Sequence, residues 1–299
     1  MKEEDFRKYY EISKEKIGEG WLSSVYIAKS KGTREKRAIK IINFNKLKYI
    51  FKKYNLKEAN DNDIKTYIDS YIKETENMIM IEGSNKENKN TVKLHEYFKT
   101  DKEFAIVMEL CDDNLMSILI KRNTSFNSNE IYEILNQLNN TFKLMVKNKL
   151  VHRDLKLENI LVKYENKEKN KYTIKLTDYE VMTKLRTFTE KCSLRVGTLK
   201  YMAPEILEGN KYGRECDLWS LGIMIYTLFF KEFPFDGETD NELLKQINIY
   251  DANKSIKKTE NKELDDLIGR LLVKDPIKRI TWKQYFIHPF FKKSRQILY

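Results

Sequence analysis

Three side chains with complementary chemistry lie close together in LVHRDLKLENILV, residues 150–162. A carboxylate such as Asp154 can orient a hydroxyl group and accept its proton. Lys156 can neutralise a phosphoryl group during transfer, and the Asn159 amide offers the hard oxygen donor that Mg²⁺ prefers. An ordinary charged surface loop would explain the polar residues, but not the apolar strand that begins directly after Asn159. The pattern favours a catalytic loop.

A second carboxylate follows in KLTDYEVMTK, residues 175–184, where Asp178 ends the second strand of a predicted hairpin. One carboxylate and one amide from neighbouring loops can hold Mg²⁺ on a triphosphate. Asp178 and Asn159 are therefore the candidate metal ligands.

Near the N-terminus, KIGEGWLSSVY places Gly18, Gly20 and Val25 between two predicted strands, with Ser23 at the third position of the pattern. Glycines allow backbone amides to approach phosphate oxygens, although an ordinary hairpin turn has the same composition. Lys40 lies in an otherwise apolar strand, so its ammonium group needs an anionic partner unless the strand is at an edge.

The elements that must position these residues can be read from hydrophobic periodicity. Alternation predicts strands in the first forty-odd residues and in residues 91–110, and residues 44–82 show the spacing of two helices around a polar break at NDND. SNEIYEILNQLNNTFKLMVKNK is a predicted amphipathic helix capped by Ser128. A hairpin over residues 159–178 and further helices from about Pro204 complete a β-rich part followed by a helical part.

Composition limits the class of protein. The longest apolar run, residues 218–230, is shorter than the roughly 20 residues of a membrane span, and no signal-peptide core is present. The net charge of +11 invites a nucleic-acid interpretation, but 45 of the 56 basic residues are Lys and only 11 are Arg, which favours a solvated surface. Three cysteines without paired spacing indicate reduced thiols. We expect an intracellular protein in the cytoplasm, with the nucleus left open.

The ordered set GEGWLSSV, AIK, HRDLKLEN, DYE, GTLKYMAPE, DLWSLG and KDPIKRITWKQYFIHPFF resembles the eukaryotic protein kinases over nearly the whole chain. The resemblance implies a single α+β, bilobal kinase domain over residues 1–299, with a β-rich N-lobe of about 1–110 and a helical C-lobe of about 111–299. It implies transfer of the γ-phosphate of ATP, with Mg²⁺, to protein hydroxyl groups. Lys156 and Gly197-Thr198 resemble serine/threonine kinases, nearest to the ULK or calmodulin-kinase-like groups.

The resemblance also assigns roles to single residues. Asp154 would be the catalytic base, Lys156 would neutralise the γ-phosphate, and Lys40 would bridge the α- and β-phosphates. Asn159 and Asp178 would hold Mg²⁺. The implied nucleotide-binding residues are Gly18, Gly20, Ser23, Val25, Ala38, Lys40, Glu74, Met108 as gatekeeper, Glu109 and Cys111 in the hinge, and Leu161.

Other implied roles are structural. Glu74 or Glu76 would pair with Lys40, and Glu74 is favoured because Met78 and Ile81 follow it on one helix face. The remaining implied roles are a Glu205–Arg279 pair, an Asp217 anchor for the helix containing Trp219, and spine positions at His152 and Tyr179.

Regulation and partners follow from the same resemblance. Arg153 before Asp154 is typical of kinases whose activation segment is ordered by a phosphate, and Thr189 and Ser193 are the acceptors for an upstream kinase. A segment that orders without phosphate is the alternative. Glu158 matches a position that recognises basic residues in protein substrates.

Glu180 departs from the family pattern, which has glycine there. In a left-handed conformation a non-glycine residue costs about 1–2 kcal/mol, and elsewhere it costs nothing. Its carboxylate would bind the metal more tightly, remain in solvent, or hinder a loop movement. The prediction is an active kinase with altered switching, and the alternative is a nucleotide-binding pseudokinase scaffold. A basic nucleic-acid-binding protein is a distant third interpretation.

Overall fold

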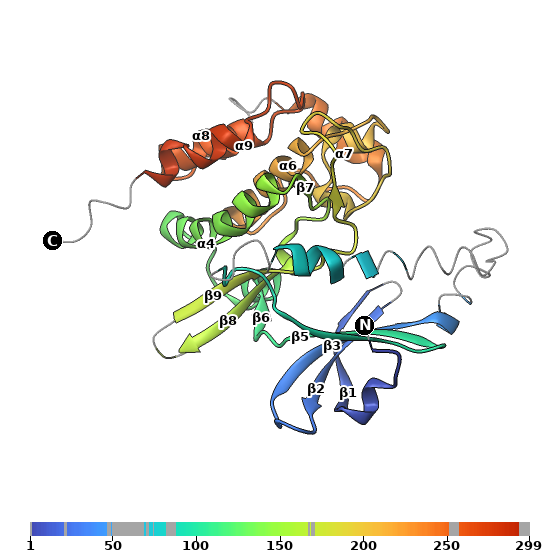
Figure 1. The fold of residues 1–299 in the computed structure, drawn as a ribbon. Helices are drawn as coiled ribbons and strands as arrows, with labels where there is room; N and C mark the ends of the chain where they lie inside the picture. Colours follow the sequence, from blue (N-terminus) through green and yellow to red (C-terminus); the bar gives the residue numbers. More distant parts are fainter. Residues whose placement is uncertain are drawn as a thin grey trace. The chain divides into compact units, whose positions relative to one another are not determined.

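The computed structural model describes residues 2–20, 23–46, 49, 69, 72–73, 75–81, 88–166, 168, 171–250 and 257–292. The chain separates into two units (Figure 1). The first unit comprises Met1–Glu87 and Thr91–Asp112, and the second comprises Asn88–Asn90 and Asp113–Tyr299. The first is built mainly on a sheet and the second mainly on helices, which confirms the predicted α+β class.

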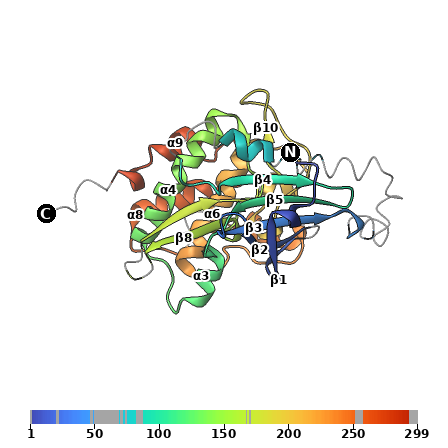
Figure 2. The ribbon, with the colours of Figure 1, turned by 60° about the horizontal axis from the view of Figure 1, so that its bottom comes forward.

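Five antiparallel strands form the sheet of the first unit, in the order β1-β2-β3-β5-β4 (Figure 2). The alternating apolar residues therefore formed strands where the sequence predicted them. Their bounds are β1 (Tyr10–Glu19), β2 (Ser23–Ser30), β3 (Lys36–Asn43), β4 (Leu94–Lys99) and β5 (Glu103–Glu109), preceded by the short 3₁₀ helix η1 (Phe6–Lys8).

The two faces of this sheet are distinct, because successive side chains of a strand point to opposite faces. The register places Val25 opposite Lys40, and these residues define what we call the inner face. Tyr26 lies opposite Ile39, and together with Ile41 these residues define the outer face.

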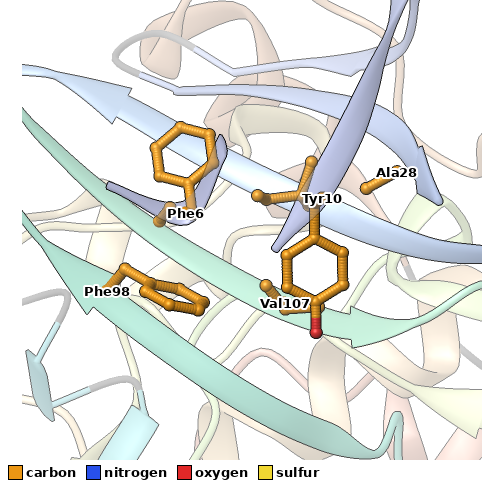
Figure 3. Packing of buried hydrophobic residues seen from close by; sticks show 7 residues of the cluster. Phe6, Tyr10, Ala28, Phe98 and Val107 are labelled. Atoms are coloured by element: carbon orange, nitrogen blue, oxygen red, sulfur yellow. The ribbon is translucent and has the colours of Figure 1, made fainter. Parts of the chain in front are cut away.

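Part of the outer face is covered by η1. Phe6 of η1 is fully buried there, and its ring lies 6.3 Å from that of Phe98 on β4 (Figure 3). Tyr10 lies on the same side of the sheet, close to Val107 of β5. The complete cluster is Phe6, Tyr10, Ala28, Ile39, Phe98, Ala105 and Val107, with Ile12, Tyr26 and Ile41 partly buried against it.

Helical residues of the first unit lie between β3 and β4 in the sequence. Residues 44–46 and 75–81 are helical, within the stretch predicted to hold two helices. The polar break at NDND falls outside the described residues.

The second unit contains two small antiparallel sheets, β6-β8-β9 and β7-β10, among helices. The β8–β9 hairpin is the one that the sequence predicted. The bounds are β6 (Asp113–Asn114), α3 (Leu115–Lys121), α4 (Ser128–Lys147), β7 (Leu150–Val151), η2 (Leu157–Asn159), β8 (Ile160–Asn166), β9 (Lys171–Leu176), β10 (Thr183–Lys184), η3 (Leu199–Tyr201), α5 (Pro204–Leu207), α6 (Glu215–Phe230), α7 (Asp240–Ile249), α8 (Lys262–Leu271), α9 (Trp282–Phe286) and η4 (Pro289–Phe291).

Helices α4 and α6 are long but differ in character. The predicted Ser128 cap of α4 is wrong by one residue: Asn127 accepts from the Glu130 N–H, and the Glu130 side chain accepts from the Asn127 N–H. This reciprocal pair satisfies two donors at the helix start. The sequence of helix α6 is apolar on nearly all sides, and the residues from Cys216 to Leu228 are accordingly buried. Within the described part of the chain, helices long and apolar enough to cross a membrane are absent.

A short segment before β4, Asn88–Asn90, belongs to the second unit although its sequence neighbours belong to the first. The Asn90 amide donates to the carbonyl oxygen of Ile174 at 2.9 Å and to Gln137 at 3.3 Å. Its carbonyl oxygen accepts from the N–H of Leu176 and from Thr141. The polar segment is thus held by side chains of α4 and by the β9 backbone.

Candidate active site

The loop between β7 and η2 is held by hydrogen bonds to a side chain of α6. Asp217 of α6 is 1% exposed, and its two carboxylate oxygens accept from the N–H groups of His152 and Arg153, both at 2.8 Å. Burial raises the pKa of Asp217, while these two backbone bonds oppose the rise. Asp217 therefore joins α6, the helix that it was predicted to anchor, to the loop that carries Asp154.

Asp154 is the centre of a hydrogen-bonded group of side chains. Its Oδ1 accepts from the Thr198 hydroxyl at 2.8 Å, and its Oδ2 lies 2.8 Å from the Lys156 ammonium. Lys156 also donates to the Thr198 hydroxyl at 2.9 Å, which closes a three-membered ring of contacts. Asn159 donates its amide to the Asp154 carbonyl oxygen at 2.9 Å. The structure thus brings together the three predicted loop residues and adds Thr198.

Gly197 explains how Thr198 reaches this group. Its φ is +111°, and a Cβ at this position would lie 2.5 Å from the carbonyl oxygen of Arg153. Only glycine allows so close an approach of the two backbones without strain. The sequence pattern around Thr198 indicated the class of kinase, but it did not identify Thr198 as a partner of Asp154 and Lys156.

Asp178 follows β9 in a left-handed conformation, with φ of 64°. The N–H of Thr177, the residue before it, donates to the Asn159 carbonyl oxygen at 3.1 Å, so the two candidate metal-binding loops are joined through their backbones. Because the Asn159 amide nitrogen is directed to Asp154, its amide oxygen is the atom suited to a metal ion. One carboxylate and one amide fit Mg²⁺, which usually takes its other ligands from substrate phosphates and water.

Tyr179 and Glu180 occupy the altered motif. Tyr179 is fully buried, its ring lies 5.6 Å from that of His152, and its hydroxyl donates to the Leu176 carbonyl oxygen at 2.8 Å. The extra hydroxyl is therefore satisfied, and the two predicted spine residues pack together. Glu180 is partly exposed, and it is absent from the described non-glycine residues with positive φ, which are Arg34, Lys149, Arg153, Asp178 and Lys231.

The activation segment after Glu180 is held by several contacts. Strand β10 pairs with β7, and Arg153 donates its Nε to the Val181 carbonyl oxygen at 2.6 Å. The Tyr212 hydroxyl donates to the Leu194 carbonyl oxygen at 2.6 Å, and Tyr212 and Cys192 exchange two backbone hydrogen bonds. Burial raises the pKa of Tyr212 to about 12 and also raises that of Cys192. This part of the segment is therefore tied to the loop before α6.

The predicted nucleotide-binding residues of the first unit lie along its inner face and glycine hairpin. Gly18 lies opposite Val25, and the Gly20 N–H donates to the Ser23 carbonyl oxygen at 2.9 Å. Lys40 is 6% exposed. The candidates further along the chain are the buried Ala38 and Met108, which lie opposite each other, and the partly buried Glu109 and Cys111; Leu161 belongs to the second unit, in β8.

The partner of Lys40 is a prediction that the structure leaves open. Glu74 lies outside the described residues. Met78 and Ile81 are buried, as expected for the face that follows Glu74, whereas Glu76 is exposed.

A buried ion pair supports the segment that ends at Glu205. The Arg279 guanidinium donates to both Glu205 oxygens at 2.8 Å, so the predicted pair forms with bidentate geometry. Its other donors reach the carbonyl oxygens of Glu215, Val273 and Lys274. This network fixes α5 against α6 and thereby the end of the loop that presents Thr198.

Comparison with known proteins agrees with this geometry. The family described as the protein kinase domain matches residues 11–291. The chain is 31% identical to calcium-dependent protein kinase 5 of Plasmodium falciparum (isolate 3D7) over 99% of its own length and 47% of that protein. It is 30% identical to myosin light chain kinase A of Dictyostelium discoideum, over 97% of this chain and 90% of that one.

A third relative is the carbon catabolite-derepressing protein kinase of Secale cereale, 30% identical over 92% of this chain and 50% of that protein. The chain spans about half the length of the calcium-dependent kinases that it matches. Of the two groups that the sequence suggested, these relatives are consistent with the calmodulin-kinase-like one.

Proposed function

The chain belongs to the protein kinase domain family, and from this premise we propose that it is an active serine/threonine kinase that transfers the γ-phosphate of Mg-ATP to protein hydroxyl groups. The observation that carries the proposal is the contact group of Asp154, Lys156, Thr198 and Asn159. A carboxylate, an ammonium and an amide held together in this way have the composition that phosphoryl transfer requires.

In the proposed reaction the substrate hydroxyl oxygen forms a bond to the γ-phosphorus, and the bond from that phosphorus to the β,γ-bridging oxygen breaks. Asp154 orients the hydroxyl group and accepts its proton, and ADP leaves with the bridging oxygen. Lys156 stabilises the charge on the transferred group. The Thr198 hydroxyl, which donates to Asp154 and accepts from Lys156, holds these two side chains in position. Most of the acceleration in such a reaction comes from positioning and electrostatics.

The remaining residues bind the nucleotide in this proposal. Asn159 and Asp178 hold Mg²⁺, which neutralises phosphate charge when bound. Lys40 contacts the α- and β-phosphates, with Glu74 as its favoured partner. Val25, Ala38 and Leu161 enclose the adenine in this proposal, and the backbone of the hinge, residues 109–111, forms hydrogen bonds with it.

The proposal also assigns residues that would contact a protein substrate or be phosphorylated by an upstream kinase. Glu158 is exposed and accepts from the Tyr201 hydroxyl at 3.3 Å, so its carboxylate is accessible to a basic residue of a protein substrate. Thr189 and Ser193 are exposed, which suits them as acceptors for an upstream kinase. A cytoplasmic location is in line with the free thiols of Cys111, Cys192 and Cys216.

Transfer of labelled γ-phosphate from Mg-ATP to the chain itself and to a mixed basic protein substrate tests the proposal. An Asp154→Asn variant keeps the size of the side chain and removes its basicity. Transfer by the native chain and not by the variant is the expected result. Absence of transfer by both, also after treatment with an activating kinase, would contradict it.

The second candidate is a nucleotide-binding pseudokinase scaffold, and the observation that favours it is Glu180 in place of glycine. This candidate predicts that the native chain binds Mg-ATP, that Lys40→Ala weakens binding, and that no phosphate is transferred. Equilibrium binding of a fluorescent ATP analogue, measured beside the transfer assay, separates the two.

A further inference from the structure

The outer face of the first unit's sheet carries a pocket that the proposed reaction does not use. Its volume is about 630 Å³. Its floor is formed by Ile12, Tyr26 and Ile41, the three partly buried residues at the margin of the cluster that η1 covers. Figure 3 shows how Phe6 of η1 packs with the buried residues of this face. Among the described residues, the apolar outer face therefore continues beyond the part that η1 covers.

Charged side chains form both rims of the pocket. On one rim the Arg7 guanidinium contacts both carboxylate oxygens of Glu103, at 2.6 and 3.2 Å. On the other rim Glu19 lies 2.8 Å from the Lys16 ammonium and 3.6 Å from that of Lys46. Arg7 also lies 3.4 Å from the Asp5 carboxylate, whereas Lys16 and Lys46 share the carboxylate of Glu19.

We propose that this pocket docks a segment of a protein partner that presents an apolar side chain beside an aspartate or glutamate. The apolar group would lie on the three floor residues, since removal of such surface from water drives docking. The carboxylate would pair with Lys16 and Lys46, which compete for Glu19. Charge complementarity selects an acidic partner and disfavours a basic one.

Docking at this place has a mechanical consequence. Ser24 and Tyr26, which line the pocket, flank Val25 of the inner face, and Ile41 follows Lys40 directly. Glu19, on the rim, lies between Gly18 and Gly20. A partner on the outer face would therefore change the position of the glycine hairpin, and with it the affinity for nucleotide; this coupling rests on the proposed function.

Binding is tested first without nucleotide, so that its failure is separate from failure of the kinase proposal. The probes are short fluorescent peptides of Gly and Ser that carry one Leu, Phe or Trp and one Glu at several separations. Fluorescence anisotropy with the full chain gives the affinities. We expect at least one peptide to bind saturably, with roughly threefold loss when its Glu is replaced by Gln.

Variants locate the site. Lys46→Glu should weaken the acidic peptide roughly tenfold, because it removes one attraction and adds one repulsion. The matched control Lys36→Glu makes the same charge change at an exposed position near the other end of β3, and should change affinity less than about twofold. Ile41→Thr keeps a β-branched residue in the strand and should also weaken binding, with the thermal unfolding of each variant measured in parallel.

Three results would overturn docking: no saturable peptide binding, equal losses in Lys46→Glu and Lys36→Glu, or binding of phenylbutyrate as tightly as the peptides, which would mark a small-molecule pocket. The coupling is tested with Asp154→Asn, in which Mg-ATP is not consumed. Peptide and nucleotide must change each other's affinity by the same factor. An unchanged peptide affinity at saturating Mg-ATP would overturn the coupling.

Discussion

Replacement of Glu180 by glycine separates two explanations of the altered motif by the sign of a stability change. If Glu180 occupied a left-handed conformation, glycine would relieve about 1–2 kcal/mol of strain and stabilise the protein. In the structure the residue of the motif with positive φ is Asp178, at 64°, and Glu180 does not share that conformation. Glycine at this position therefore relieves nothing.

The expected magnitude follows from the unfolded state. Glycine has more accessible backbone conformations than any other residue, so Glu180→Gly should lower the free energy of unfolding by about 0.4–1 kcal/mol relative to Glu180→Ala. The alanine variant is the matched control, because it removes the carboxylate and keeps the Cβ. Urea titration followed by fluorescence measures both variants. A glycine variant more stable than the alanine variant by 1 kcal/mol or more would refute the assignment of the strain to Asp178 alone.

The same two variants test the proposed change in switching. If the restricted backbone at Glu180 slows movement of the loop, Glu180→Gly should change the transfer rate and Glu180→Ala should not. If the carboxylate acts on the metal, both variants should shift the dependence of the rate on Mg²⁺ concentration in the same direction. Unchanged ATP affinity, Mg²⁺ dependence and rate in Glu180→Gly would remove the claim of altered switching and leave the kinase proposal intact.

Three further predictions concern the scaffold of the site. Arg279→Ala leaves the Glu205 carboxylate buried and unpaired, and should lower the free energy of unfolding by about 3–5 kcal/mol, with Glu205→Gln restoring part of the loss in the double variant; urea unfolding measures both. Tyr212→Phe removes the hydrogen bond to the Leu194 carbonyl oxygen and should cost about 1 kcal/mol, seen as faster limited proteolysis in the activation segment at unchanged proteolysis elsewhere. Burial raises the pKa of the Cys216 thiol well above its usual value, so iodoacetamide at mildly alkaline pH should label it only after unfolding; rapid labelling of the native chain would contradict the buried position.

The grouping of Asp154, Lys156 and Asn159 was predictable because the three residues lie within six consecutive positions. Their side chains can therefore meet within one loop, which Asp217 then holds in place. The strands of the first unit were predictable for a similar reason, since their alternation is contained in each strand.

Thr198 was not predictable as a member of the site by the same reasoning. It is separated from Asp154 by 44 positions, and its contact depends on the close approach of Gly197 to the Arg153 backbone. The Gly-Thr pair was visible in the sequence, but a glycine signals only that some backbone or ligand comes near. Which backbone comes near is decided by the tertiary fold.

Asn88–Asn90 shows the limit of composition as a guide. A polar run rich in Asn and Lys is typical of a solvated loop, yet Asn90 is 6% exposed and bonded to groups of α4 and β9. Its partners lie 47 and 84 positions along the chain. The helix cap at Asn127 is a smaller case, because Asn127 and Ser128 are both good caps and only the backbone geometry chooses between them.

The distribution of strain in the motif bears on whether Glu180 marks a lost activity. Aspartate is among the few residues other than glycine that adopt the left-handed region readily, because its short polar side chain can bond locally. In this chain the aspartate that would hold the metal also takes the unusual conformation, and Glu180 at the third position does not have positive φ. A glycine there would serve mobility of the loop and not its static geometry. In our proposal the substitution acts on the movement of the loop, while the groups that would carry out transfer remain in place around Asp154.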